Sequence, residues 1–166
     1  MADVEFVVRD ARPADYAAIA NITVGVFIGE GYVEVESTEH LRDVATRATA
    51  TTLLVARTVD EDEVIGAVSL APAGSAYSQI CRDGEAELRM LIVGPSWRGH
   101  GVGEALVRAC LERARSSGAD AVVLSTQPPM LASQRLYERM GFTRTPERDW
   151  HMSRGKQMLT YARTTD

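Results

Sequence analysis

The sequence predicts an α/β fold with a mixed central sheet, in a single domain over residues 1–166. Two runs rich in β-branched residues, 51–59 and 64–70, flank the polar turn Asp60–Glu63 and predict an antiparallel hairpin. A continuous apolar run within 120–126 comes after a segment with helical spacing in the chain. Such a run is typical of a buried parallel strand. The length suits one domain, because domains cluster near ~100–200 residues.

Local signals predict one strand and two helices before the hairpin. Residues 5–9 are expected to form the first strand. Pro13 then favours a helix start, since proline fits a first helical turn, and apolar residues keep helical spacing until two glycines interrupt the pattern. A second helix is expected to start at a cap, Ser37 or Thr38, and to run through Ala48.

Strands and helices alternate after the hairpin. The spacing predicts a central helix that Gly118 ends as a left-handed cap, and a shorter helix that Gly141 closes. The order is therefore β-α-α-β-β-β-α-β-α-β-β, antiparallel early and parallel around the central helix. The expected elements are a strand at 85–93, a helix at 101–117, the strand at 120–126, a helix at 131–140, and strands at 142–144 and 157–163.

Composition excludes several classes of function. The net charge of −5 argues against a nucleic-acid partner, because binding to phosphates needs a basic patch. No apolar run approaches the roughly 20 residues of a membrane span, and the start lacks the order of a signal peptide, so no membrane association is expected. Cys81 and Cys110 form neither a disulfide framework nor a zinc spacing, which indicates no metal and a reducing, cytoplasmic location.

The most specific stretch is 91–106, LIVGPSWRGHGVGEAL, which joins a strand end, a tight turn, a glycine-rich loop and a helix start. Gly99, Gly101 and Gly103 let the backbone approach a ligand, and the free N–H groups of a first helical turn bind phosphate. Arg98 adds a guanidinium that can bind a phosphate through two hydrogen bonds. Neither a P-loop nor a dinucleotide fingerprint fits this spacing. The alternative is a tight turn that binds nothing.

This stretch, together with Ser133–Phe142, resembles the GNAT family of N-acetyltransferases. The resemblance covers most of the chain and implies a GNAT-type sheet in which the parallel strands 85–93 and 120–126 splay apart, flanked by helices. It also implies acetyl-CoA as the donor, with its pyrophosphate on the amides of 98–103. Met130 stands where the family often has asparagine, and Ser133 is expected to substitute in part. The implied donor-binding residues are Leu91, Ile92, Val93, Arg98, Gly99, His100, Gly101, Val102, Gly103 and Ser133.

The same resemblance places the pantetheine arm of the donor along Leu91–Val93. Pantetheine has two amides, so it can add to an exposed strand edge as a peptide does. A bulge near Met90–Ile92 is expected to open that edge and to aim an N–H at the thioester oxygen.

Tyr137 is the candidate acid that protonates the departing thiolate. It lies ~100° around the short helix from Leu136, so it is expected to reach a cleft while Leu136 is buried. Spacing alone leaves the alternative of a packing tyrosine, and the family resemblance favours the acid.

Glu85 and Glu87 are the candidate bases that remove a proton from the amine. Residues 85, 87 and 89 share one face of a strand, and the order Glu, Glu, Arg suggests that this face looks into a wet cleft. The alternative is a structural ion pair with Arg89. A second acidic group, expected to be a solvated face or to attract a cationic amine, comprises Glu30, Glu34, Glu36 and Glu39.

Together these features predict an N-acetyltransferase that moves an acetyl group from acetyl-CoA to a primary amine, by direct attack in a ternary complex. Direct attack is expected because no cysteine lies in a motif for an acyl-enzyme. The expected acceptor is a small-molecule amine, with no nucleic-acid or membrane partner. The alternatives are a catalytically silent acyl-CoA-binding regulatory module, or acetylation of a protein amine or a hydroxyl. A homodimer formed by pairing of the strand 157–163 is also expected, since the resemblance implies edge pairing.

Overall fold

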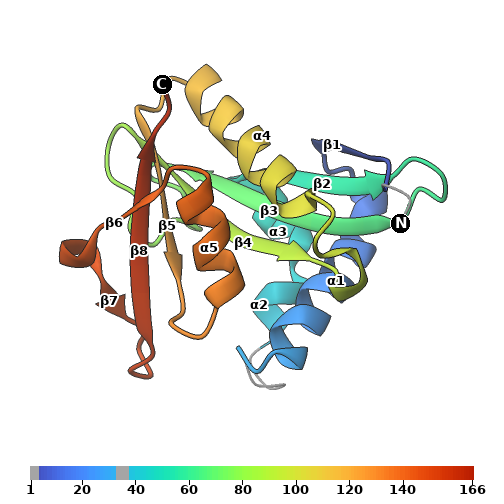
Figure 1. Cartoon of the computed structure of the whole chain (residues 1–166), viewed down its shortest axis with the longest axis horizontal. Helices are drawn as coiled ribbons and strands as arrows, with labels where there is room; N and C mark the ends of the chain where they lie inside the picture. The colour runs from blue at the N-terminus through green and yellow to red at the C-terminus, as the bar shows by residue number, and fades with distance from the viewer. Residues whose placement is uncertain (1–3, 33–37) are drawn as a thin grey trace. The chain divides into compact units, whose positions relative to one another are not determined.

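The computed structural model has a mixed α/β fold, and its elements can be followed in Figure 1. Within the described ranges, no helix is both long and apolar enough to cross a bilayer. The expectation of a single domain stays a prediction, because the chain divides into two compact units that are described separately. The structure describes residues 4–32 and 38–166, and the units comprise residues 1–69 with 90–109 and residues 70–89 with 110–166.

The first unit begins with two antiparallel strands, β1 and β2, and the three α-helices that lie between them in the chain. β1 and β2 pair from Phe6 opposite Thr58 to Asp10 opposite Leu54, and β3 follows β2 in the strand order. The 3₁₀ helix Pro13–Asp15 leads into α1, as the proline predicts. The bounds are β1 Phe6–Asp10, α1 Tyr16–Gly29, α2 Glu39–Arg42, α3 Val44–Ala50, β2 Thr52–Thr58 and β3 Val64–Pro72. Two further elements, β4 at Glu85–Val93 and α4 at Val102–Ser116, are shared by the two units, and residues 90–109 of this stretch belong to the first.

The second predicted helix is divided in two, as α2 and α3. They are separated at Asp43, whose φ of −82° and ψ of 66° lie outside the helical region. The Asp43 carboxylate caps α3 by accepting the N–H of Thr46 at 3.2 Å. A capping residue has a non-helical backbone, so the residue that begins α3 also ends α2. The start expected at Ser37 lies outside the described residues.

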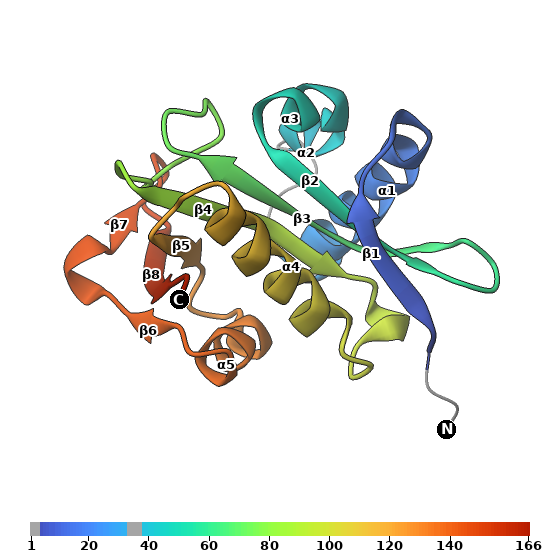
Figure 2. The ribbon, with the colours of Figure 1, turned by 90° about the horizontal axis from the view of Figure 1, so that it is seen from above.

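The core of the first unit lies between its strands and its first three helices, which gather on one side of β2 and β3 (Figure 2). Leu53 and Val55 of β2 belong to this core together with Ile19 and Val26 of α1. Residues two apart in a strand face the same way, so one face of β2 is covered by helices. Ile92 of β4 joins the same cluster and is only 2 % exposed.

On β3, the backbone at Gly66 approaches α4 so closely that no side chain fits between them. A Cβ at Gly66 would lie 3.1 Å from side-chain carbons of both Val102 and Leu106, and 2.9 Å from the carbonyl oxygen of Ile92. The first turns of α4 therefore pack directly on the β3 backbone. This contact sets the position of the helix start that follows the glycine-rich stretch.

Gly66→Ala is expected to destabilise the protein by about 1–3 kcal/mol, because overpacking forces β3, β4 and α4 apart. Urea unfolding followed by circular dichroism measures the change. Gly25→Ala in α1 is the control, since a Cβ there meets nothing within 4 Å and alanine favours a helix. An equal or greater loss of unfolding free energy in the Gly25 variant would contradict this account.

The second unit carries the parallel pair. β4 and β5 pair from Glu85 opposite Ala121 to Leu88 opposite Leu124, whereas β8 is antiparallel to each of its partners. One parallel pair among antiparallel strands confirms the predicted mixed sheet. The two-residue strand β7 was not predicted, because two residues carry no alternating pattern. The bounds are β5 Ala121–Thr126, α5 Leu131–Arg139, β6 Thr143–Arg144, β7 Trp150–His151 and β8 Gln157–Thr164.

Strand β8 is paired on both sides. Its residues 159–164 pair with β5, and its other side pairs with β6 and β7. The expectation that 157–163 offers a free edge for a second copy is therefore wrong, because edge pairing needs unpaired N–H and C=O groups. A homodimer stays a prediction, without this strand as its interface.

Candidate active site

In the first unit, β4 becomes irregular just before it reaches the glycine-rich stretch. Its register with β5 covers Glu85–Leu88, and the strand continues to Val93 through Met90, which has a φ of 57°. This left-handed conformation costs a non-glycine residue about 1–3 kcal/mol and clusters at functional sites. It lies in the segment where a bulge is expected. After the strand, the N–H of Gly94 donates to the carbonyl of Ile65 at 2.9 Å and fixes the turn.

The glycine loop, residues 98–103, follows the 3₁₀ helix Pro95–Trp97. Gly99 and Gly101 have φ values of 81° and 82°, in the left-handed region that glycine adopts without strain. A Cβ at either position would meet nothing within 4 Å, so one side of the loop is open. These glycines are therefore required by backbone conformation rather than by crowding from the protein.

Helix α4 starts inside this loop, at Val102. The N–H of Ala105 donates to the carbonyl of Gly101 at 3.0 Å, which begins the helical ladder. The N–H groups of the first helical turn have no acceptor within the helix, and the helix dipole is positive there. An open loop with left-handed glycines and free N–H groups fits a diphosphate. Val102 is 1 % exposed and anchors the helix start.

Arg98 carries the positive charge of the loop. One of its guanidinium nitrogens forms an ion pair with Glu30, the residue after the end of α1. The Arg98 side chain is 45 % exposed, so it can still reach a ligand. Of the acidic group noted in the sequence, Glu30 is thus paired, Glu39 is exposed, and Glu34 and Glu36 lie outside the described residues.

In the second unit, Glu87 is fully buried, at 0 % exposure. Its Oε1 accepts the N–H groups of Gln79 at 2.8 Å, Ile80 at 2.8 Å and Cys81 at 3.0 Å. The expectation of a wet face is wrong at this residue, because the segment 77–82 covers it. Its Oε2 is also buried and has no hydrogen-bond partner among the described residues.

Glu85 is bound on both carboxylate oxygens. Arg148 donates to Oε2 at 2.8 Å and to Oε1 at 2.9 Å, and the N–H of Arg82 donates to Oε1 at 2.9 Å. Burial alone would raise the pKa of Glu85, but these hydrogen bonds and the charge of Arg148 hold it below its ordinary value. Arg148 also donates to the carbonyl of Ile80 at 2.7 Å, so it ties the segment 77–82 to β4.

Arg89 completes this attachment. It donates to the carbonyl of Tyr77 at 2.8 Å, whereas the structural alternative in the sequence was an ion pair of Arg89 with Glu85 or Glu87. Side chains of β4 therefore satisfy backbone groups along a segment that has no regular structure of its own. The sequence shows alternation in β4 but contains no sign of which segment its polar face would bind.

Tyr137 is buried in the second unit, at 5 % exposure, whereas Leu136 is half-buried. The sequence predicted that Leu136 is buried while Tyr137 reaches a cleft, and the structure shows the reverse. The Tyr137 ring packs against Phe142 and Tyr161, with centroid distances of 5.7 Å and 6.3 Å. Burial raises the pKa of its hydroxyl well above the ordinary value, so the group stays protonated at neutral pH.

The predicted site residues fall into two groups. The first unit holds Leu91–Val93 and the glycine loop, with His100 half-buried on it. The second unit holds Glu85, Glu87 and Tyr137, together with the half-buried Ser133 on α5. Glu85 and Glu87 meet around the segment 77–82, and Tyr137 lies in a separate aromatic cluster.

Comparison with known proteins decides the family. A family model described as the acetyltransferase (GNAT) family matches residues 17–142. The chain belongs to the GNAT family. The glycine loop and the strand before it lie within the matched region, so the resemblance seen in the sequence and the GNAT-type fold are confirmed.

The curated relatives are longer than the region they share with this GNAT chain. Human N-acetyltransferase 8B is 34 % identical over 92 residues, which cover 55 % of this chain and 39 % of that protein. Zebrafish (Danio rerio) N-acetylaspartate synthetase is 40 % identical over 65 residues, which cover 39 % of this chain and 23 % of that protein. The chain therefore matches well under half of each relative.

Solved GNAT structures match nearly the whole chain. An acetyltransferase of the GNAT family from Staphylococcus aureus superposes with a TM-score of 0.78 at 13 % identity, covering 97 % of this chain and 99 % of that one, which shows the fold alone. A GNAT acetyltransferase from Brucella melitensis in complex with acetyl-CoA has a TM-score of 0.64 at 28 % identity, covering 84 % of this chain and 83 % of that one.

Proposed function

We propose that this chain is an acetyl-CoA-dependent N-acetyltransferase that acts on a primary amine by direct attack in a ternary complex. The observation that carries the proposal is the open glycine loop, with left-handed Gly99 and Gly101, at the start of α4 in a GNAT chain. The acetyl-CoA bound to the Brucella melitensis neighbour supports the choice of donor. The free thiols of Cys81 and Cys110 suit the reducing cytoplasm that we propose as its location.

The donor would be held by backbone groups more than by side chains. The N–H groups of the glycine loop bind the diphosphate, and Arg98 adds charge beside it. The pantetheine arm lies along Leu91–Val93, where the left-handed Met90 supports an opened strand edge. His100, Val102 and Ser133 complete the proposed donor contacts.

The acceptor is proposed to be a small molecule with a primary amine. The amine gives up a proton and attacks the thioester carbonyl, so that a C–N bond forms and the C–S bond breaks, and the thiolate takes a proton. Tyr137 is the proposed acid, and the support for it is its place in the segment 133–142 that resembles the GNAT family. Burial raises the pKa of its hydroxyl, so the proton is present at neutral pH but is given up less readily. Glu87 is favoured over Glu85 as the base, because its Oε2 keeps free lone pairs whereas Arg148 occupies both oxygens of Glu85.

Direct attack is supported by the state of the two thiols. Burial, with the charges of Glu87 and Glu85, raises the pKa of Cys81 to about 11, and burial raises the pKa of Cys110 to about 12. Neither is a thiolate at neutral pH, and a thiol nucleophile needs the thiolate form.

Calorimetry with acetyl-CoA and a thiol-release assay over a panel of amines test the proposal. Gly101→Ala is expected to weaken acetyl-CoA binding at least tenfold, because alanine strains the left-handed backbone that aims the N–H groups. Gly118→Ala is the matched control, with a φ of 88° and open space around its Cβ, but at the far end of α4. It should keep full affinity despite a similar strain of about 1–2 kcal/mol.

Two results of these assays would count against the proposal. Binding of acetyl-CoA without thiol release on any amine would favour the silent acyl-CoA-binding module. Equal loss of affinity in the Gly101 and Gly118 variants would place the donor away from the glycine loop.

A further inference from the structure

The ion pair between Arg98 and Glu30 joins the glycine loop to the end of α1, within the first unit. Glu30 is the C-cap of α1, and its N–H donates to the carbonyl of Val26 at 3.1 Å. A carboxylate is disfavoured at this end of a helix, because the dipole there is negative. Arg98 is the cation that offsets this cost.

Glu30 is held from a second side by Tyr32. Burial and a hydrogen bond to Glu30 both raise the pKa of the Tyr32 hydroxyl, so it stays a donor to the carboxylate. The ring of Tyr32 packs edge-on against Phe27 of α1, with centroids 6.0 Å apart. The carboxylate is therefore kept beside Arg98 by the fold of α1 and is 29 % exposed.

A diphosphate on the glycine loop would compete with this carboxylate. An arginine has five N–H donors, so Arg98 can turn some of them to a phosphate while it still contacts Glu30. Two negative groups on one guanidinium repel each other, and the repulsion is strongest at low ionic strength. Removing the charge of Glu30 should then strengthen binding of the diphosphate.

We propose that Glu30 is an affinity-setting residue of the donor site, which competes with the diphosphate for Arg98 and so speeds release of the product CoA. This inference rests on the proposed function, because it needs the diphosphate on the glycine loop. Release of product limits the turnover of many enzymes. The residue at the end of α1 would therefore affect the rate of turnover through the release of CoA.

Calorimetry with CoA tests the inference in Glu30→Gln, which keeps the shape of the side chain and removes its charge. We expect the Kd for CoA to fall about 3–5-fold at low salt, the upper range for exposed charge pairs, and the difference to shrink in ~0.5 M salt. Stopped-flow displacement should show CoA leaving the variant more slowly by a similar factor. Glu61→Gln, an exposed change of equal charge in the same unit, should leave the Kd unchanged.

A double-mutant cycle isolates the competition. In an Arg98→Gln background, Glu30→Gln should no longer tighten CoA binding, because the shared guanidinium is gone. The inference is overturned if Glu30→Gln binds CoA no more tightly than the parent, if Glu61→Gln tightens it equally, or if the gain persists without Arg98. Failure of the parent protein to bind CoA at all overturns the proposed function itself, and this inference with it.

Discussion

Replacing Glu87 by alanine is expected to destabilise the protein by about 3 kcal/mol or more. The change removes the shared acceptor of three backbone N–H groups, at residues 79–81, and a hydrogen bond to a charged group contributes about 1.5–3 kcal/mol. The segment 77–82 should open, and hydrogen exchange at its amides should accelerate. Urea unfolding measures the stability, and exchange mass spectrometry locates the change.

Glu87→Gln separates this anchoring from catalysis. Glutamine keeps an oxygen in the position of Oε1, so most of the stability should remain. A base role for Oε2 predicts that kcat falls about 10²–10⁴-fold in the same variant, because the amide cannot take a proton. Full turnover by the glutamine variant would rule out the base role, and unchanged stability of the alanine variant would rule out the anchor.

Tyr137→Phe is expected to lower kcat about 10²-fold while the Kd for acetyl-CoA stays within a factor of about two. The substitution removes only the hydroxyl, whose proton is proposed for the thiolate, and keeps the ring contacts with Phe142 and Tyr161. Initial rates over a range of pH, with calorimetry for the donor, measure both quantities. The protein should unfold at nearly the same urea concentration as the parent.

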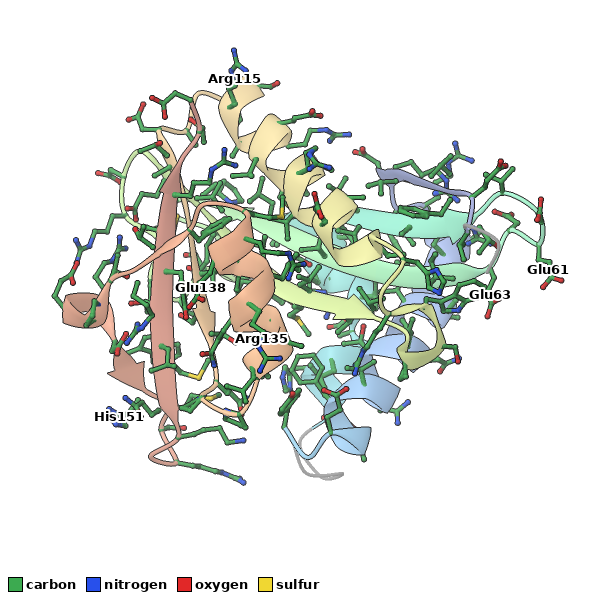
Figure 3. All side chains as sticks on the ribbon, viewed as in Figure 1. Glu61, Glu63, Arg115, Arg135, Glu138 and His151 are labelled. Atoms are coloured by element: carbon green, nitrogen blue, oxygen red, sulfur yellow. The ribbon has the colours of Figure 1, made fainter. Side chains whose placement is uncertain are left out.

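Tyr161→Phe is the control for this change. Its hydroxyl donates to Glu138 of α5 at 3.2 Å, and Glu138 is labelled on that helix in Figure 3. This variant also loses a phenolic oxygen, from the ring next to Tyr137, yet kcat should not change. An unaltered kcat in the Tyr137 variant, or an equal fall in both variants, would contradict the acid role.

The sequence predicted the fold well where local signals decide it. The bounds of β4 agree with the predicted strand at 85–93, and α4 ends close to Gly118, whose φ of 88° suits a left-handed cap. The glycine loop was found for the same reason, since Gly99 and Gly101 report a backbone conformation and not a distant contact.

Contacts between distant segments could not be predicted in the same way. The burial of Tyr137 depends on its contact with Tyr161. The ion pair of Arg98 with Glu30 joins residues that are 68 positions apart in the sequence. Helical spacing does not show which face of a short helix the rest of the fold will cover. The break at Asp43 did have a local signal, because an aspartate three residues before Thr46 is a typical helix cap.

The most direct measurement of the central claim is a titration of ¹⁵N-labelled protein, comparing CoA with pantetheine, which has the same thiol arm and no diphosphate. If the loop N–H groups hold the diphosphate, amide signals of residues 99–103 shift with CoA and stay in place with pantetheine. Loop signals that ignore CoA, or that respond equally to both compounds, would contradict the account.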